Sequence, residues 1–163
     1  NDFGQNAFAT MSETKVQGIN YFTFLHGYDI MAGENIFHSK YDISGYNITV
    51  YSINSGYYGF FQKKTMIEWL INSLRKDKEN FKIAYYHNPL FPGCPDHRPT
   101  YEEVDAKSKL TTIFTNLDVK VAFEHHEHLY KMTYPMNHQN ISNSSKNGTI
   151  YVGGGQWGAP HSQ

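Results

Sequence analysis

Apolar side chains recur along the chain at two spacings in turn, one typical of strands and one typical of helices. Short apolar or aromatic runs of strand length occur at residues 45–54, 81–86 and 119–123. Residues 62–76, between the first two runs, carry apolar side chains at helical spacing. Thr100-Tyr101-Glu102-Glu103 matches a capping box and predicts the start of a second helix before the third run.

Two further apolar segments, 129–134 and 149–152, flank a stretch rich in Asn and Ser at 137–147. They predict a pair of strands on either side of an exposed loop. The element order is therefore β-α-β-α-β followed by a β-pair, which predicts an α/β fold with parallel strands and right-handed crossovers. In such sheets ligands bind beyond the carboxyl ends of the strands, so we expect the chemistry there.

Composition limits the classes of protein that the chain can represent. Its 163 residues suit one domain, and 16% aromatic residues supply enough apolar area for a core. The net charge of -1 argues against a large basic surface for nucleic acid or anionic lipid. No apolar run is long enough to predict a membrane span. With Cys94 as the single cysteine, neither an internal disulfide nor a Cys-rich zinc module can form.

Histidines occur just beyond the second and third predicted strands. His87 follows one strand, and His125, His126 and His128 follow the other. Because carboxyl ends of neighbouring parallel strands share one edge of a sheet, we expect three or four imidazoles to converge there. Imidazole is the commonest protein ligand for transition metals, so the pattern predicts a metal site, with His125 assigned to an outer position or to solvent.

The abundance of histidine supports a simpler interpretation for other members of the set. The chain has nine histidines, so some clustering arises by chance. Four isolated ones are interpreted as surface or satisfied core residues: His26, His38, His138 and His161.

Three stretches carry a recognisable family pattern. Residues 121–131 read Val-Ala-Phe-Glu-His-His-Glu-His-Leu-Tyr-Lys, residues 83–89 read Ile-Ala-Tyr-Tyr-His-Asn-Pro, and residues 151–155 read Tyr-Val-Gly-Gly-Gly. In order and spacing they resemble the last signatures of the calcineurin-like metallophosphoesterases, in particular the purple acid phosphatase-like branch. The resemblance covers about residues 20–158. One departure is His125, which stands where the family usually has Gly before His-x-His.

The earlier signatures of that family, Asp-x-His, Gly-Asp-x-x-Asp and Gly-Asn-His-Asp/Glu, do not occur in the chain. The resemblance therefore implies that residues 1–163 are the C-terminal half of a layered α-β-β-α metallophosphoesterase domain. We expect the missing N-terminal half in the same gene or on an associated chain. It would supply the bridging Asp and the leaving-group His, so that no catalytic residue other than metal ligands is expected here.

Carried over by position, the resemblance implies that His87 and His126 bind one metal and His128 the other. The family uses two ions, of Fe, Zn or Mn, and a metal-held hydroxide that attacks a phosphate ester. The implied activity is acid phosphatase-like hydrolysis by the complete protein, with the isolated chain inactive.

Two other functions are compatible with the same residues. One is a non-catalytic secretory interaction or structural protein that retains the phosphoesterase fold. The other is a mononuclear metal-binding domain, complete in itself, with three histidines and an open site. An upstream half that carries Asp and Asn ligands would favour the enzyme.

Acceptor sequences for N-glycosylation occur at Asn47, Asn140, Asn143 and Asn147, where chance predicts about two. They favour a secreted or lumenal glycoprotein, of lysosome or vacuole type. Asn47 lies in a predicted strand, so it can be modified only if its side chain faces outward.

The glycines Gly153, Gly154 and Gly155 follow a predicted strand. No helix that begins with Lys-Ser/Thr comes after them, so they are not a nucleotide-binding P-loop. We expect a backbone turn near the metal site.

Overall fold

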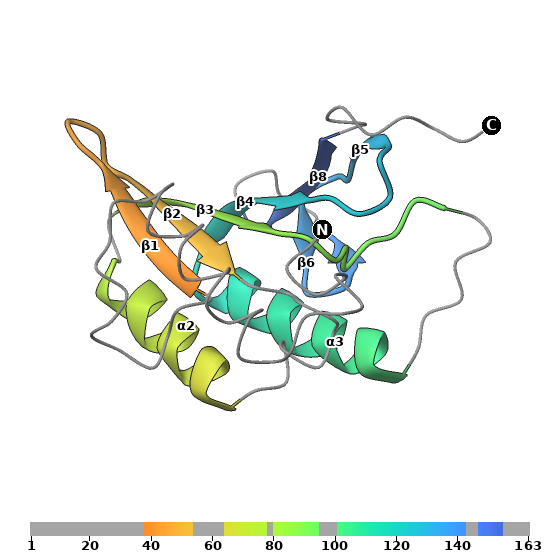
Figure 1. Cartoon of the computed structure of the whole chain (residues 1–163), viewed down its shortest axis with the longest axis horizontal. Helices are drawn as coiled ribbons and strands as arrows, with labels where there is room; N and C mark the ends of the chain where they lie inside the picture. Colours follow the sequence, from red (N-terminus) through yellow and green to blue (C-terminus); the bar gives the residue numbers. More distant parts are fainter. Residues whose placement is uncertain (1–37, 54–63, 78–79, 95–100, 143–146, 155–163) are drawn as a thin grey trace, which may run out of the picture.

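The computed structural model describes residues 38–53, 64–77, 80–94, 101–142 and 147–154. Figure 1 shows the helices of this part of the chain beside a twisted sheet. Within it, no helix is long and apolar enough to cross a membrane. The elements are β1 (His38–Ile43), β2 (Ile48–Ile53), α2 (Lys64–Lys76), β3 (Phe81–Tyr86), α3 (Tyr101–Asn116), β4 (Val119–Glu124), β5 (Tyr130–Met132), β6 (Met136–Asn137), β7 (Asn140–Ile141) and β8 (Ile150–Gly154).

Six of these strands form one mixed sheet in the order β1-β2-β3-β4-β8-β5. The central neighbours β2–β3, β3–β4 and β4–β8 are parallel, and the two edge strands β1 and β5 are antiparallel to their neighbours. The predicted α/β fold, the parallel strands joined through helices and the final β5–β8 pair are thus confirmed. The first expected strand begins later, at Ile48, because residues 44–47 form the turn that leads from β1.

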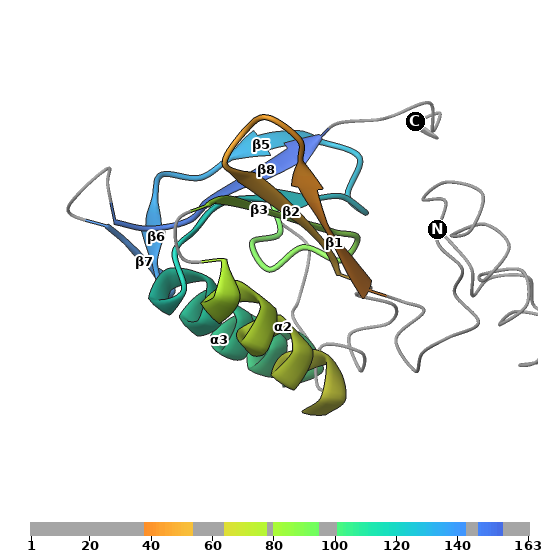
Figure 2. The same ribbon diagram turned by 90° about the vertical axis from the view of Figure 1, so that its left-hand side faces the viewer.

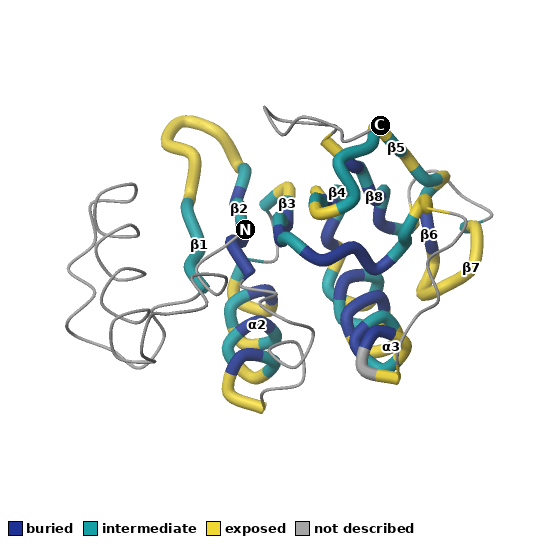
Figure 3. The backbone as a smooth tube through the Cα atoms, turned by 45° about the vertical axis from the view of Figure 1, so that its right-hand side comes forward, coloured by how far each residue is buried: buried dark blue, intermediate teal, exposed yellow. Residues whose placement is uncertain are grey.

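Both helices cover the same face of the sheet, as Figure 2 shows. Alternation along the strands sends every second side chain toward them; in β3 these are Lys82, Ala84 and Tyr86. The helices contribute apolar side chains at helical spacing, and Figure 3 shows that the buried backbone lies in the central strands and along one side of each helix. The largest fully buried apolar side chains are Tyr51, Tyr86, Tyr151, Phe114, Leu70, Leu74, Leu110 and Val119.

Two features of the fold were not expected from the sequence. Strand β1 is polar because it lies at an edge, where Lys40 Nζ pairs with the Asp77 carboxylate beyond α2 at 2.9 and 3.0 Å. The stretch 137–147, expected to be a loop throughout, contains the turn of a small hairpin in which β6 pairs with β7. Both are short segments without a clear apolar alternation, so the pattern did not reveal them.

Candidate metal centre

His87 and His126 lie side by side beyond the carboxyl ends of β3 and β4. The parallel register pairs Tyr86 with Glu124, so the residues that follow each strand start from the same edge of the sheet. The Nε2 atom of His87 lies 3.0 Å from Nδ1 of His126, and the ring centroids are 5.0 Å apart. The expected proximity of these two imidazoles is confirmed.

The separation of the two nitrogens suits a shared cation. Nitrogens that each lie about 2.0–2.1 Å from one ion are about 2.9–3.4 Å apart at coordination angles of about 90–110°. The observed 3.0 Å falls in this range. The described residues contain no group of three or more His, Cys, Asp or Glu side chains placed to hold a metal.

The protonation state of His87 also suits metal binding. Burial lowers the pKa of His87 to about 4, and the charges of His126, His125 and His128 add to the effect. At neutral pH the ring is therefore neutral and has a lone pair available, which a metal ligand requires. The role of His128 as a ligand stays a prediction.

His125 contacts the main chain at the end of β3 through its ring and its own amide. Its Nδ1 lies 2.8 Å from the carbonyl oxygen of Tyr86, and its main-chain N–H donates to the His87 carbonyl at 3.0 Å. Since a carbonyl only accepts, Nδ1 carries the proton of this contact. The ring thus ties the loop after β4 to the end of β3, and the outer position expected for it stays a prediction.

The backbone of the loop after β4 is left-handed at two histidines. The φ angles are 63° at His126 and 50° at His128. A residue other than Gly in this region costs about 1–3 kcal/mol and persists where its surroundings enforce it. The positive φ angles thus occur at His126 and His128 and not at His125, the position where the family that the sequence resembles usually has Gly.

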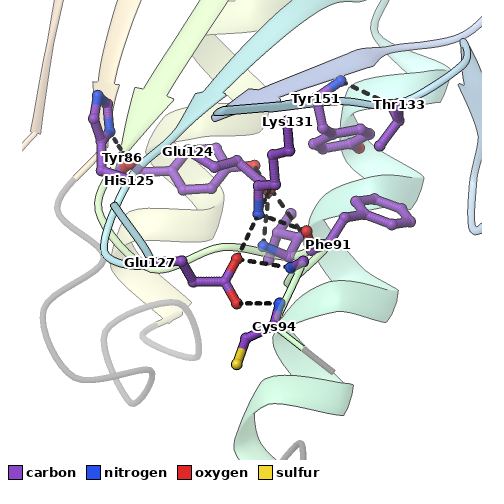
Figure 4. Close-up of polar contacts among 11 residues, drawn as sticks. Tyr86, Phe91, Cys94, Glu124, His125, Glu127, Lys131, Thr133 and Tyr151 are labelled. Atoms are coloured by element: carbon purple, nitrogen blue, oxygen red, sulfur yellow. Dashed lines mark hydrogen bonds and ion pairs between the residues drawn. The ribbon is translucent and has the colours of Figure 1, made fainter. Parts of the chain in front are cut away.

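A buried carboxylate at the end of β4 accepts hydrogen bonds from β3, from the loop after β3 and from β5. Glu124 ends β4 with its side chain fully buried. Figure 4 shows how neighbouring segments converge on it. Its donors are one hydroxyl, two main-chain amides and one ammonium: Tyr86 Oη (2.9 Å), Leu90 N (2.7 Å), Phe91 N (3.4 Å) and Lys131 Nζ (3.1 Å).

A second carboxylate, Glu127, lies between the two left-handed histidines and shares Lys131 with Glu124. It accepts from Gly93 N at 2.7 Å, Cys94 N at 3.1 Å and Lys131 Nζ at 3.1 Å. Burial raises the pKa of Glu127, but these hydrogen bonds and the Lys131 charge outweigh it and lower the pKa overall. The carboxylate is therefore ionised at neutral pH and accepts from all three donors.

The sequence reasoning missed this set of charged residues, although a signal for Glu124 was present. The alternation of β4 places Glu124 on the same face as Ala122, which is buried. A carboxylate on the inward face of a strand requires partners, and Lys131 was available seven residues later.

The expected turn at the glycine-rich tail is wrong for the two glycines that the structure describes. Gly153 and Gly154 end β8 and pair with Lys131 and Tyr130 of β5. Gly155 lies outside the described residues. A Cβ atom at Gly153 would lie 2.6 Å from Lys131 Cγ and 2.8 Å from the Leu129 carbonyl oxygen, so glycine here makes room for the lysine stem.

Substitution of Gly153 by alanine is expected to destabilise the fold by about 1–3 kcal/mol, because the added methyl group overpacks against backbone. Urea unfolding measures the effect. Gly93→Ala is the matched control, since its Cβ would meet only side-chain atoms of Leu129 and Lys131, at 3.1 Å or more. Equal losses for the two variants would contradict the close packing at Gly153.

Comparison with known proteins finds similarity of structure but not of sequence. No family model matches the chain, and no curated protein sequence matches it. Among solved structures, it is similar to a purple acid phosphatase from seeds of yellow lupin (Lupinus luteus), with a TM-score of 0.63 and 19% sequence identity. The match covers 76% of this chain and 24% of the lupin chain. At this identity the similarity shows the fold, which is consistent with that of the metallophosphoesterases.

Proposed function

We propose that this chain carries part of the metal centre of a metal-dependent phosphoesterase of the acid phosphatase type. The observation that carries the proposal is the imidazole pair of His87 and His126, with ring nitrogens 3.0 Å apart at the carboxyl ends of two parallel strands. The similarity of fold to a purple acid phosphatase supports the same assignment. The substrate class would be phosphate esters.

The residues of this chain would prepare the site for the ions. His87 Nε2 and His126 Nδ1 would bind one cation through neutral rings, and we propose that His128 binds a second. When bound, two such ions of Fe, Zn or Mn supply a hydroxide nucleophile and neutralise charge on the phosphoryl oxygens. We assign no metal to His125, because its Nδ1 atom is held by the Tyr86 carbonyl.

We propose that the remaining ligands come from an N-terminal half that completes the domain. The chain spans about a quarter of the length of the lupin enzyme, which leaves room for such a part in the complete protein. Two cations held close together repel each other, and a bridging carboxylate offsets this repulsion with its own negative charge. The mononuclear alternative would need three ligands from this chain alone, and the described residues hold no group of three His, Cys, Asp or Glu side chains placed for one ion.

The test is phosphate release from an aryl phosphate, with Fe, Zn or Mn added, by the 163-residue chain and by the complete protein. We expect turnover by the complete protein and none by the chain alone. Turnover by the chain alone would overturn the division of the site between two halves. A complete protein that binds metal without turnover would favour the non-catalytic interaction protein.

We also propose that the protein passes through the secretory pathway. Asn47, Asn140 and Asn147 have exposed side chains, while Asn143 lies outside the described residues. Asn47 lies in the β1–β2 turn rather than in a strand, which corrects the expectation and removes the restriction on its orientation.

Secretion from a eukaryotic host is expected to yield a protein whose electrophoretic mobility increases after treatment with an N-glycan-cleaving enzyme. Each substitution of an occupied Asn by Gln should remove one step of the mobility ladder. Asn137→Gln is the control, because Asn137 is exposed but is not followed by the acceptor pattern. An unchanged mobility on enzyme treatment would argue against the secretory proposal.

A further inference from the structure

The loop that carries His126 and His128 is joined to the loop after β3 by contacts on both sides of His126. Before His126, the main-chain N–H of His125 donates to the His87 carbonyl at 3.0 Å. After it, the Glu127 carboxylate accepts from the main-chain amides of Gly93 and Cys94. His126 thus lies between two contacts that join its loop to the loop after β3, where His87 lies.

The Glu127 contacts are short-range and directional. Its two oxygens accept one amide each, at 2.7 Å to Gly93 and 3.1 Å to Cys94, while Lys131 adds a charged donor at 3.1 Å. Figure 4 shows the carboxylate turned toward Cys94 and Lys131. Lys131 in turn donates to the Phe91 carbonyl at 2.5 Å, so one side chain and its counter-ion attach the segment from Phe91 to Cys94.

The backbone on either side of Glu127 needs such support. His126 and His128 both have left-handed φ angles, which a residue with a Cβ atom adopts at a cost. If the Glu127 contacts were lost, both residues could relax toward ordinary backbone angles. Relaxation would rotate each imidazole away from its present position, because the ring direction follows the backbone of its own residue.

We propose that Glu127 is a positioning residue of the metal centre: through Gly93, Cys94 and Lys131 it holds the histidine loop so that His126 faces His87. This inference rests on the proposed function for its metal readout. Glu127 itself lies outside the pair of ring nitrogens and would act through the loop. Glu124 shares Lys131 with Glu127, but its side chain is fully buried and belongs to the core.

Two measurements on the 163-residue chain test the proposal. Calorimetric Zn²⁺ titration, with Co²⁺ absorption as a report on coordination by imidazole, compares wild type with Glu127→Ala, Glu127→Gln and Asp105→Ala. The last is the matched control, because Asp105 accepts from Lys109 at 2.7 Å on α3, within one helix and apart from the rim. In metal-free protein, NMR records the nuclear Overhauser effect between the His87 and His126 rings.

We expect Glu127→Ala to weaken Zn²⁺ affinity about 10–100-fold and to abolish the ring-to-ring signal. Glu127→Gln, which keeps one acceptor oxygen, should fall between Ala and wild type, and Asp105→Ala should match wild type. Affinity and ring signal unchanged in Glu127→Ala would overturn the proposal while leaving the proposed function intact. If the wild-type chain binds no Zn²⁺ without the ligands of the other half, the ring signal alone decides: its loss in Glu127→Ala supports positioning, and its retention overturns it.

Discussion

Replacement of His126 by asparagine is expected to weaken metal binding by the complete protein about 100-fold or more, since loss of a residue that merely supports a ligand already costs 10–100-fold. Asparagine is chosen because it tolerates the left-handed backbone at this position better than alanine does. The variant therefore removes the imidazole with little added strain. Metal content after dialysis and calorimetric titration measure the loss.

His138→Asn is the matched control for this variant. His138 is also left-handed, with φ of 53°, and its exposed side chain lies in the turn between β6 and β7. We expect this control to bind metal as the wild type does. Equal affinities for His126→Asn and the wild type would show that the ring pair is a structural hydrogen bond and not a metal site.

Replacement of Glu124 by alanine is expected to lower the free energy of unfolding by about 3–5 kcal/mol, the usual cost of breaking a buried ion pair from one side. The change removes the acceptor of the Leu90 and Phe91 main-chain amides and of the Tyr86 hydroxyl, and it leaves Lys131 with fewer partners in a largely buried position. Chemical denaturation of the 163-residue chain measures the effect.

Glu68→Ala provides the comparison for a surface carboxylate. Glu68 pairs with Lys64 at 3.7 Å on the exposed side of α2, and its loss should change the free energy of unfolding by no more than about 0.5 kcal/mol. If the two variants proved equally stable, the Glu124 network would contribute to position alone and not to stability.

The sequence was sufficient to predict the central part of the fold. Residues 81–86 and 119–124 alternate or run apolar between clear helical segments, and a parallel pairing follows from that order. The proximity of His87 and His126 followed in turn, because each histidine lies within two residues of the end of one of two neighbouring strands. Both predictions depend only on the apolar pattern of each strand and on the pairing of adjacent strands.

Features that depend on loops could not be predicted in the same way. The loop that carries His126 and His128, both with left-handed φ angles, is joined through Glu127 to residues more than thirty positions earlier in the chain. No local pattern encodes such contacts, and the loop decides where each ring points. Strand β1 was missed for a related reason, since its polar residues are stabilised by Asp77 from a distant segment.

The adjacency of His87 and His126 has a consequence for the chain as a polymer. The two residues are 39 positions apart, and α3 lies entirely between them. A cation bound to both rings would act as a reversible cross-link that closes a loop of this length. In the chain-entropy account of disulfides, closing a loop of this length lowers the conformational entropy of the unfolded chain and so stabilises the folded state by about 4 kcal/mol. Removal of the ion by a chelator would then open the loop and lower the melting temperature. The same ion would contribute both to the proposed chemistry and to the thermal stability of the domain.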